Sequence, residues 1–261
     1  MVFWATIDML RFIRPFAMPA LVLGALEWWA RTVGKDSDAI APPTAAALAF
    51  WRALMSTGEG SILQATGFTL ACAGAGLALG AALGLLAGIT LGLSRRAAQT
   101  AFLTAEVLRP IPSVALIPLA MLVFGFGLRM EFSIVAFAAF WPLLILTQAA
   151  VRQVEPRLFE VSQVLGLSPA QRAFKIILPA IIPRLFVALR LGVAVALVVA
   201  VTVEVAANPH GMGYAMMIAQ QSMDPALMLA WLFWIGVAGY AVNFAALKIE
   251  RWVGRRMGVA A

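Results

Sequence analysis

The sequence predicts an all-α membrane protein with six transmembrane helices. Of its 261 residues, 63% are hydrophobic and the mean hydropathy is +0.94, whereas a soluble domain is about half apolar. Only 12% of the residues are charged, which is about half the share in soluble domains. Apolar segments long enough to cross a bilayer recur along the chain. We therefore expect one transmembrane domain over residues 1–261, without a soluble module.

The first span is expected at about residues 15–29. Arg11 and Arg14 precede it, and their charge predicts a cytoplasmic N-terminus. A glutamate and two tryptophans at 27–29 replace the small residues of a signal-peptide cleavage site. We therefore expect an uncleaved helix.

A polar external loop is expected over residues 31–60. Within it, residues 44–55 place Leu48, Trp51 and Leu54 on one helical face. This spacing predicts a short interfacial helix outside the membrane. An ordered loop is the alternative.

The second span is expected within residues 66–93, and a regular series of glycines marks it. The glycines occupy positions 76, 80, 84, 88 and 92. Small residues four apart let another helix backbone approach closely. No polar side chain lines this stripe, so it predicts helix packing rather than ligand binding.

The third span is expected over residues 106–127, which contain Pro110, Pro112 and Pro118. Prolines at membrane depth are tolerated where neighbours or a cavity satisfy the freed backbone groups. The span is therefore predicted to face the protein interior and the pathway, with Pro112 as a pathway candidate.

Two charged residues begin this third span. Glu106 and Arg109 are three positions apart, so they are neighbours if this turn is helical. A structural ion pair at the inner boundary is the first interpretation, and an inner gate is the alternative.

Three further spans are expected at about residues 134–151, 185–207 and 226–247. Pro142 is predicted to interrupt the first of them, and Arg129 and Glu131 before it are assigned to a short external loop. We expect residues 214–226 to be a partly re-entrant or interfacial stretch.

Glu204 and His210 are further pathway or gate candidates. A charge inside a span is unfavourable by roughly 2.5–3.5 kcal/mol on insertion scales, so such residues tend to face a cavity or a partner. Glu204 is near the predicted external end of the fifth span, and an interfacial position is its alternative. His210 belongs to a predicted turn at 208–213, where a loop hydrogen bond is the simpler role.

On this topology fourteen of the 19 basic residues lie inside, four lie outside and Arg109 lies near a boundary. The inside set is Arg11, Arg14, Arg95, Arg96, Arg152, Arg157, Arg172, Lys175, Arg184, Arg190, Lys248, Arg251, Arg255 and Arg256. Positive charge is concentrated in cytoplasmic loops, so both termini are predicted to be cytoplasmic. The same bias explains the net charge of +7 without nucleic-acid binding.

The stretch 155–183 is polar and strongly patterned, although it lies between spans. Pro156 suits the first position of a helix, and Gly166 suits a left-handed C′ position. The apolar residues between them are Leu158, Phe159, Val161, Val164 and Leu165. Their spacing predicts an amphipathic helix.

A second helix is predicted to begin directly after this turn. Ser168, Pro169 and Gln171 have the spacing of a capping box with proline at the first helical position. Pro179 and Pro183 are expected to disturb the helix. A rigid knob at the membrane surface and an amphipathic segment lying on lipid both remain open on this pattern.

The stretch 155–183 resembles a cytoplasmic loop of ABC-importer membrane subunits. That loop carries Glu-Ala-Ala, three residues, Gly, nine residues and then Ile-x-Leu-Pro. Here the matching residues are Glu160, Gly166, Ile176, Leu178 and Pro179. Valine and serine at 161–162 replace the two alanines. In the family this segment contains the coupling helix, which docks into a separate ATPase subunit.

The resemblance implies the ATPase-coupling residues of this chain. They are Glu160, Gly166, Leu167, Ser168, Pro169, Arg172, Ile176, Leu178 and Pro179.

A second run resembles a narrower branch of these permeases, which carries nitrate, sulfonates, taurine and related solutes. Its pattern is Arg-Pro-x-Pro, Ala-x-x-Pro-Leu and Trp-Phe-Gly-x-Gly. The matching residues are Arg109, Pro110, Pro112, Ala115, Pro118, Leu119, Phe124, Gly125 and Gly127. Val123 replaces the tryptophan. The branch also has an acid at the place of Glu204, and the resemblance covers about residues 44–247.

The resemblance implies the type I ABC importer permease fold and a set of partners. These are a second copy of the permease, two ATPase subunits, an external solute-binding protein and the lipid bilayer. ATP-Mg is expected on the partner ATPase, because this chain has no Gly-x4-Gly-Lys-Ser/Thr loop. One cysteine and one histidine argue against a metal cluster. We expect no cofactor and no enzymatic chemistry in this chain.

The expected solute is a small organic or inorganic anion. A neutral or cationic metabolite, such as a pyrimidine or vitamin precursor, is the alternative within the same family. A secondary transporter is a more distant alternative, because the sequence shows neither mid-membrane coupling-ion groups nor inverted repeats.

Overall fold

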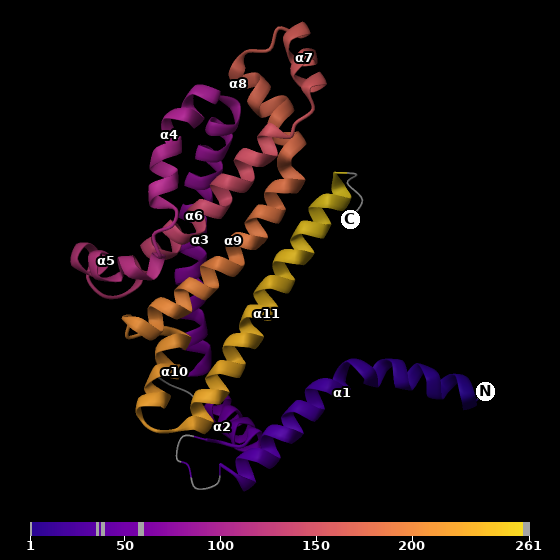
Figure 1. Cartoon of the computed structure of the whole chain (residues 1–261), viewed down its shortest axis with the longest axis vertical. Helices are drawn as coiled ribbons and strands as arrows, with labels where there is room; N and C mark the ends of the chain where they lie inside the picture. Colours follow the sequence, from indigo (N-terminus) through magenta and orange to yellow (C-terminus); the bar gives the residue numbers. More distant parts are fainter. Residues whose placement is uncertain (1, 35–36, 38–39, 57–59, 258–261) are drawn as a thin grey trace. The chain divides into compact units, whose positions relative to one another are not determined.

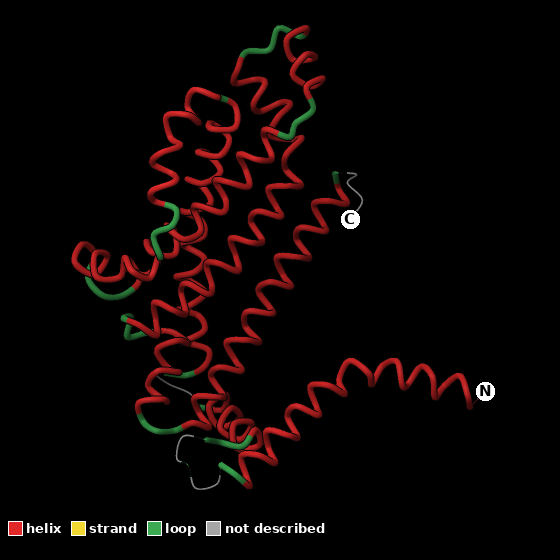
Figure 2. The backbone as a smooth tube through the Cα atoms, viewed as in Figure 1, coloured by secondary structure: helices red, strands yellow, loops and turns green. Residues whose placement is uncertain are grey.

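The computed structural model describes residues 2–34, 37, 40–56 and 60–257, and it describes their side chains except for residues 2–16, 159, 169 and 170. Every regular element in this described part is helical (Figures 1 and 2). The chain forms two compact units. Unit 1 comprises Met1–Leu63 and Ala215–Ile235, and unit 2 comprises Gln64–Tyr214 and Gly236–Ala261.

The helices of unit 1 are α1 (Val2–Thr32), α2 (Pro43–Met55), the end of α10 (Gly211–Gln221) and the beginning of α11 (Pro225–Arg256). Unit 2 contains nearly all of α3 (Ile62–Leu93), then α4 (Arg95–Leu108), η1 (Ser113–Leu116), α5 (Ile117–Phe124), α6 (Leu128–Arg152), α7 (Pro156–Val164), α8 (Pro169–Arg172), η2 (Ala173–Ile177) and α9 (Leu178–Ala206), with the remainder of α10 and α11.

The glycine stripe of α3 packs directly on α6, as the sequence predicts. A Cβ atom added to Gly84 would lie 2.8 Å from the carbonyl oxygen of Phe140, and one added to Gly88 would lie 2.6 Å from Cβ of Thr147. Such distances are shorter than real Cβ contacts, so only glycine permits this approach. Successive glycines meet successive turns of α6, from Val135 up to Val151. The two helices are therefore parallel.

Helix α9 packs antiparallel on α6 and also touches α3, since a Cβ atom added to Gly192 would lie 3.0 Å from Cδ1 of Leu77. Near the α6 N-terminus, Ile134 shares a core with Val203 of α9. Near the α6 C-terminus, Val151 shares a core with Ile181. The start of α9 therefore lies beside the ends of α6 and α3.

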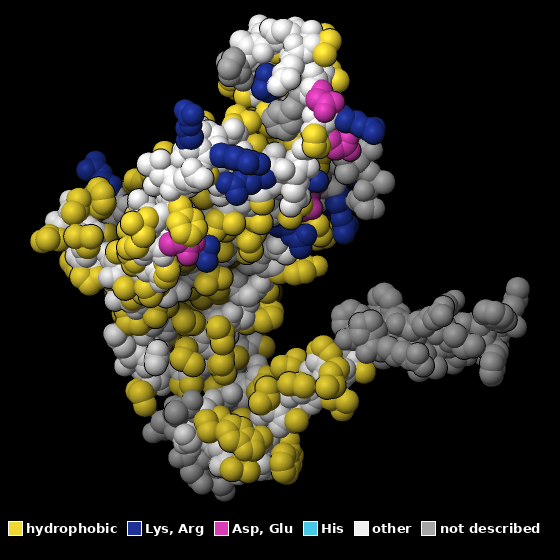
Figure 3. All heavy atoms as spheres, turned by 45° about the horizontal axis from the view of Figure 1, so that its top comes forward, with side chains coloured by type: hydrophobic (Ala, Val, Ile, Leu, Met, Phe, Trp, Pro, Cys, Tyr) yellow, Lys and Arg dark blue, Asp and Glu magenta, His cyan; other side chains and the backbone are white. Residues whose placement is uncertain are grey.

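The C-terminal part of α11 joins the same end of unit 2. Arg190 of α9 contacts Glu250 of α11 at 3.6 Å and Oδ1 of Asn243 at 3.5 Å. Arg152, Arg184 and the last turn of α11 consequently gather at one end of the unit. Figure 3 shows the dark-blue side chains concentrated toward this end.

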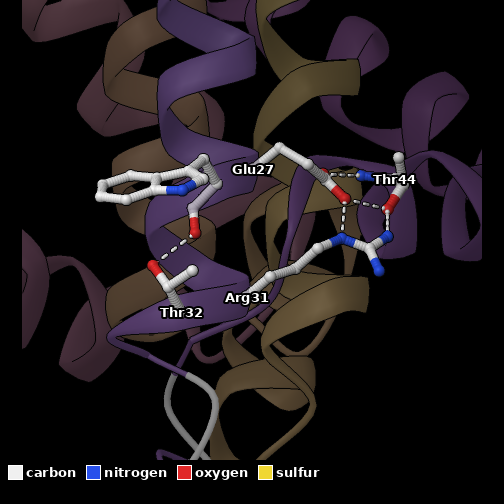
Figure 4. A network of polar contacts seen from close by, with 5 residues as sticks. Glu27, Arg31, Thr32 and Thr44 are labelled. Carbon is white, nitrogen blue, oxygen red and sulfur yellow. Dashed lines mark hydrogen bonds and ion pairs between the residues drawn. The ribbon is translucent and has the colours of Figure 1, made fainter.

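In unit 1, a polar network joins the end of α1 to the start of α2 (Figure 4). Glu27 accepts a bond from the backbone N–H of Thr44 at 3.0 Å and one from its hydroxyl at 2.7 Å. Arg31 pairs with Glu27 at 2.5 Å and donates to the Thr44 hydroxyl. Pro42 precedes α2 and makes no side-chain cap bond. Glu27 therefore supplies the cap that the local sequence lacks.

Replacing Glu27 by alanine is expected to release the first turn of α2, because the Thr44 N–H loses its acceptor. Hydrogen exchange of the α2 amides measures this loss of protection. Arg31→Ala is the matched control, since it removes the ion pair and leaves the carboxylate cap. Equal exchange in the two variants would contradict a capping role for Glu27.

Among the described residues, four helical segments are long and apolar enough to cross a membrane. They are Ile62–Leu93, Leu128–Arg152, Ala173–Gln221 and Pro225–Arg256. Arg95–Leu108 with Ser113–Phe124 forms a fifth candidate, which is bent by 82°. The helix predicted at residues 44–55 is present as α2.

Three expectations about the spans are wrong in detail. The stretch 106–127 is not one helix, because α4 ends at Leu108 and the Arg-Pro-x-Pro run turns the chain before α5. Pro142 does not interrupt α6. Its neighbours Ala139 and Leu143 are fully buried, and their packing holds the helix in shape although the proline donates no backbone hydrogen bond. Residues from Gly211 form a regular helix, α10, instead of continuing the predicted turn.

Candidate coupling segment and buried acid cluster

Helix α7 ends in the glycine turn that the sequence predicts. Gly166 has φ +63°, a conformation that is unfavourable for most residues with a side chain. The N–H of Leu167 donates to the Ser162 carbonyl at 3.0 Å, and that of Gly166 donates to the Gln163 carbonyl at 2.9 Å. These two bonds form a Schellman motif, which fixes the direction of the chain after α7.

The predicted capping box begins the next helix. The backbone N–H of Gln171 donates to Oγ of Ser168 at 3.3 Å, and the N–H of Ser168 donates to Oε1 of Gln171 at 3.0 Å. Each side chain thus satisfies a backbone donor that the helix start leaves open. Two fixed helix ends and a connection of only four residues, 165–168, leave the turn little freedom.

The second helix continues into α9 without a break. The expected disturbance at Pro179 takes the form of a π-helical turn, η2, whereas Pro183 lies inside the regular helix α9. The N–H of Leu178 donates to the carbonyl of Ala173, five residues back, and this wider turn accommodates Pro179, which has no N–H to donate. The helix that contains the expected fifth span, residues 185–207, accordingly begins already at Leu178.

The knob, defined as residues 156–178, is anchored on one side and exposed on the other. Leu158 and Leu178 pack against the core cluster that contains Val151 and Ile181. On the outer side, Val164 is 87% exposed and Phe174 is 70% exposed. Part of the predicted apolar stripe is therefore not used in the fold of this chain. Such an exposed apolar patch on a rigid element is typical of an interaction surface.

The predicted coupling residues all lie in or beside this knob. Glu160 is exposed on α7, Gly166, Leu167 and Ser168 form the turn, Pro169 and Arg172 begin and end α8, Ile176 lies in η2, and Leu178 and Pro179 begin α9. Their role in coupling stays a prediction.

The inner pathway candidates form a separate group. Glu106 and Arg109 contact each other at 3.9 Å, and both side chains are 51% exposed. This agrees with the structural ion pair. Pro112 lies just before η1, at the bend between α4 and α5. His210 is exposed, with its ring 5.1 Å from that of Phe68.

Glu204 lies in a buried polar cluster with Glu131 and Asn208. Both glutamates are fully buried and Asn208 is 1% exposed. Nδ2 of Asn208 donates to Oε2 of Glu131, and the N–H of Gly213 donates to Oε2 of Glu204 at 2.8 Å. A Cβ atom at Gly211 would overlap the Glu204 carboxylate. The glycine at this position is therefore required by the buried acid.

Sequence reasoning missed Glu131 as a member of this cluster. Its assignment to an external loop is wrong, because Glu131 lies in the first turn of α6 and is completely buried. The available signal was an acid within an otherwise apolar segment, which usually faces a partner or a cavity. The side chain of Glu204 is enclosed by protein, and its depth in the membrane stays a prediction.

Comparison with known proteins agrees with these features. The sequence pattern of the family described as "Binding-protein-dependent transport system inner membrane component" matches residues 80–259. The putative aliphatic sulfonates transport permease protein SsuC of Bacillus subtilis is 30% identical over 67% of this chain and 64% of its own length. The nitrate import permease protein NrtB of Synechocystis is 28% identical over 53% of this chain and 50% of its own.

The fold also has solved counterparts. A chain from inward-facing structures of the MetNI methionine ABC transporter superposes with a TM-score of 0.67 at 20% identity, covering 76% of this chain and 99% of that one. This likeness concerns the fold alone. The family match, which covers more than half of the chain, establishes that the protein belongs to the inner-membrane components of binding-protein-dependent transport systems.

Proposed function

We propose that this chain is the permease subunit of an ATP-driven ABC importer, in which the knob receives force from a separate ATPase. One observation carries the proposal: a rigid knob that presents apolar residues outward and continues without a break into a candidate span. The chain provides the pathway, and ATP-Mg binding and hydrolysis belong to the partner. In this role it performs no chemistry of its own.

The knob has the stiffness that a lever requires. The Schellman motif and the capping box hold α7 and α8 in a fixed relation, and Leu158 fastens α7 to the core. Because η2 continues into α9, a displacement of the knob moves α9 with it. A flexible linker at Pro179 would have absorbed that displacement.

The outer side of the knob suits a protein partner. Its exposed apolar residues Val161, Val164 and Phe174 are accompanied by the exposed Glu160. An apolar centre with a polar border is the usual anatomy of a protein interface. The knob also lies at the basic end of unit 2, and basic ends face the cytoplasm, where an ATPase is found.

We propose six spans in one transmembrane domain, with both termini in the cytoplasm. The four apolar helical segments supply four spans, the bent pair α4–α5 supplies another, and the 31-residue α1 supplies the first. Two copies of the chain frame the pathway, two ATPase subunits dock on their knobs, and an external binding protein delivers the solute. The family's dependence on a binding protein supports the last partner.

The bend at Pro112 is proposed to border the pathway, because an interrupted helix at membrane depth requires a cavity or neighbours. Glu106 and Arg109 lie beside that bend and are assigned to the inner boundary, as an ion pair or gate. Glu204 is assigned to the opposite end of the pathway, with His210 in the adjoining turn.

The proposed solute is a small organic or inorganic anion. The names of the sulfonate and nitrate relatives support this class, and the exposed Arg109 is compatible with it. A neutral or cationic metabolite is the second candidate, because much of the selectivity in such systems belongs to the binding protein. Identifying the ligand retained by the solute-binding protein encoded beside this gene decides between the two classes.

The docking role is tested by Val164→Asp. A charge at this exposed position leaves the fold intact but places an unpaired carboxylate inside the interface, so the ATPase should no longer co-purify. Gln99→Asp is the matched control, because Gln99 is exposed at the same end of unit 2 but outside the knob.

Three outcomes of this experiment are informative. Loss of the ATPase in Val164→Asp alone supports docking through the knob. Full retention in both variants contradicts it and favours a knob that lies on lipid. Solute transport by the purified chain without any ATPase would instead support a secondary transporter.

A further inference from the structure

Helices α3, α4 and α6 of unit 2 (Figure 1) enclose a series of adjoining cavities. Three cavities follow one another, with volumes of about 590, 250 and 590 Å³. The first two share Phe102 and Arg152 as lining residues, and the last two share Trp141 and Leu144. The three cavities therefore form one groove, called the α3–α4–α6 groove below.

The two ends of this groove differ in charge. Arg95 and Arg152 line the first cavity, which is the basic end. Both arginines are exposed, and neither takes part in an ion pair with another described residue. The last cavity is the apolar end: leucine, alanine and phenylalanine supply most of its lining, and no charged side chain of the described residues lines it. The groove thus combines a positive end with an apolar body.

The middle of the groove offers a free hydrogen-bond donor. Nε1 of Trp141 is buried and has no acceptor among the described residues. Buried indole N–H groups usually have a partner, so an oxygen atom of a bound molecule would complete this one. Glu106 and Arg109 also line the middle cavity, but they pair with each other at 3.9 Å. Their charges therefore compensate each other, and the two arginines of the basic end remain for an anion.

The groove is about as long as one leaflet of a bilayer is thick. Its lining on α3 extends from Leu79 at the apolar end to Leu93 at the basic end. Fourteen residue steps at 1.5 Å each give about 21 Å. Half of a bilayer, head groups included, is roughly 20–22 Å thick. The groove therefore fits a lipid in length as well as in polarity.

Helix α4 has little other packing to hold it. None of its residues is buried, and Leu103 and Val107 are 71% and 61% exposed. Most helical stability in proteins comes from packing of an apolar face. An acyl chain in the groove would supply that packing, because Ala101 and Ala105 of α4 line the apolar end. A small anionic solute would not, since the apolar end has no charged group to receive it.

We propose that the α3–α4–α6 groove binds one anionic phospholipid of the cytoplasmic leaflet. Its phosphate lies at Arg95 and Arg152, where guanidinium groups suit a phosphate. An ester oxygen accepts the free bond from Trp141, and one acyl chain fills the apolar end. Basic pockets between transmembrane helices on the cytoplasmic side commonly bind anionic head groups. The choice of leaflet rests on the orientation proposed above, whereas the site itself depends on neither the solute nor the ATPase.

The first test is thermal stability of the wild-type chain, purified in detergent with the partners that accompany it. Dioleoyl phosphatidylglycerol should raise the melting temperature by several degrees, because a ligand of the folded state stabilises it. Dioleoyl phosphatidylcholine, which has the same acyl chains, and inorganic phosphate, which has none, should each have little effect. An equal shift with both lipids, a shift with phosphate alone, or no shift with phosphatidylglycerol overturns the proposal, and none of these outcomes requires a variant.

Two double variants locate the head group. Arg95→Gln with Arg152→Gln should lose most of the shift that phosphatidylglycerol causes. Arg96→Gln with Arg255→Gln is the matched control, because it removes the same charge from exposed arginines that do not line the groove. The control should keep the shift. Equal loss in both double variants contradicts a defined head-group site and indicates general attraction to a basic surface.

Native mass spectrometry locates the acyl chain. The wild type should retain one phosphatidylglycerol molecule per permease chain. Ala105→Trp places a large side chain in the groove and should release this lipid, whereas Leu103→Trp, at an exposed position of the same helix outside the groove, should retain it. Equal retention in the two variants contradicts binding in the groove. A wild type without bound lipid whose groove residues cross-link to a second copy of the chain also contradicts it, since a protein contact would then cover the groove.

Discussion

Gly84→Leu is expected to prevent α3 from packing on α6 and to remove most folded protein from the membrane. Even the first carbon of the new side chain would lie 2.8 Å from the Phe140 carbonyl oxygen and 3.0 Å from Cβ of Leu143. The obstacle includes backbone, which cannot rotate away. Overpacking typically destabilises by about 1–3 kcal/mol, and a clash with backbone places this variant at the upper end. Detergent-extracted yield and melting temperature measure the effect.

Gly74→Leu is the matched control for this prediction. Gly74 belongs to the same helix, is exposed, and has nothing within 4 Å of its added Cβ. Leucine suits a lipid-facing position, so this variant should accumulate and melt like the wild type. If both variants are equally unstable, the loss arises from glycine replacement in general, and the packing explanation is wrong.

Gly166→Leu is expected to leave membrane insertion intact and to abolish solute-dependent ATP hydrolysis. Its added side chain meets nothing within 4 Å, so the effect comes from the backbone. A non-glycine residue in the left-handed region is unfavourable by roughly 1–2 kcal/mol. The turn relaxes away from φ +63°, and the relation between α7 and α8 changes. The measurement is ATPase activity of the reconstituted transporter with and without its loaded binding protein.

Gly166→Asn separates turn geometry from side-chain bulk. Asparagine adopts the left-handed conformation more readily than leucine, so this variant should retain most of the solute-dependent activity. Normal coupled uptake by Gly166→Leu would show that a fixed turn is unnecessary, and the lever proposal would fail. Loss of activity in both variants would indicate instead that bulk at this position blocks the ATPase.

Features that depend on neighbouring residues could be predicted from the sequence. The capping box at Ser168, the left-handed glycine at 166 and the packing stripe of α3 are present as expected. The first two are determined within one or two turns. The stripe repeats every four residues, so only its partner helix had to be found in the structure.

Features that depend on distant residues could not be predicted in the same way. Glu131 and Glu204 are 73 positions apart, and only the packing of α6 on α9 places both of them in one buried region. The continuity through Pro179 depends on a single wide turn, which is a compromise between local strain and the packing of Ile177 and Ile181. The prolines predicted a disturbance, but propensity alone does not show that this packing keeps the helix continuous.

The unbroken run from α8 through η2 to Ala206 has a consequence for the whole transport cycle. This continuous helix carries the proposed ATPase contact at its N-terminal end and the buried Glu204 near its C-terminal end. A movement of one end displaces the other, and by thermodynamic linkage the coupling acts in both directions. The nucleotide state of the motor and the packing around Glu204 would then act on one another through a single helix.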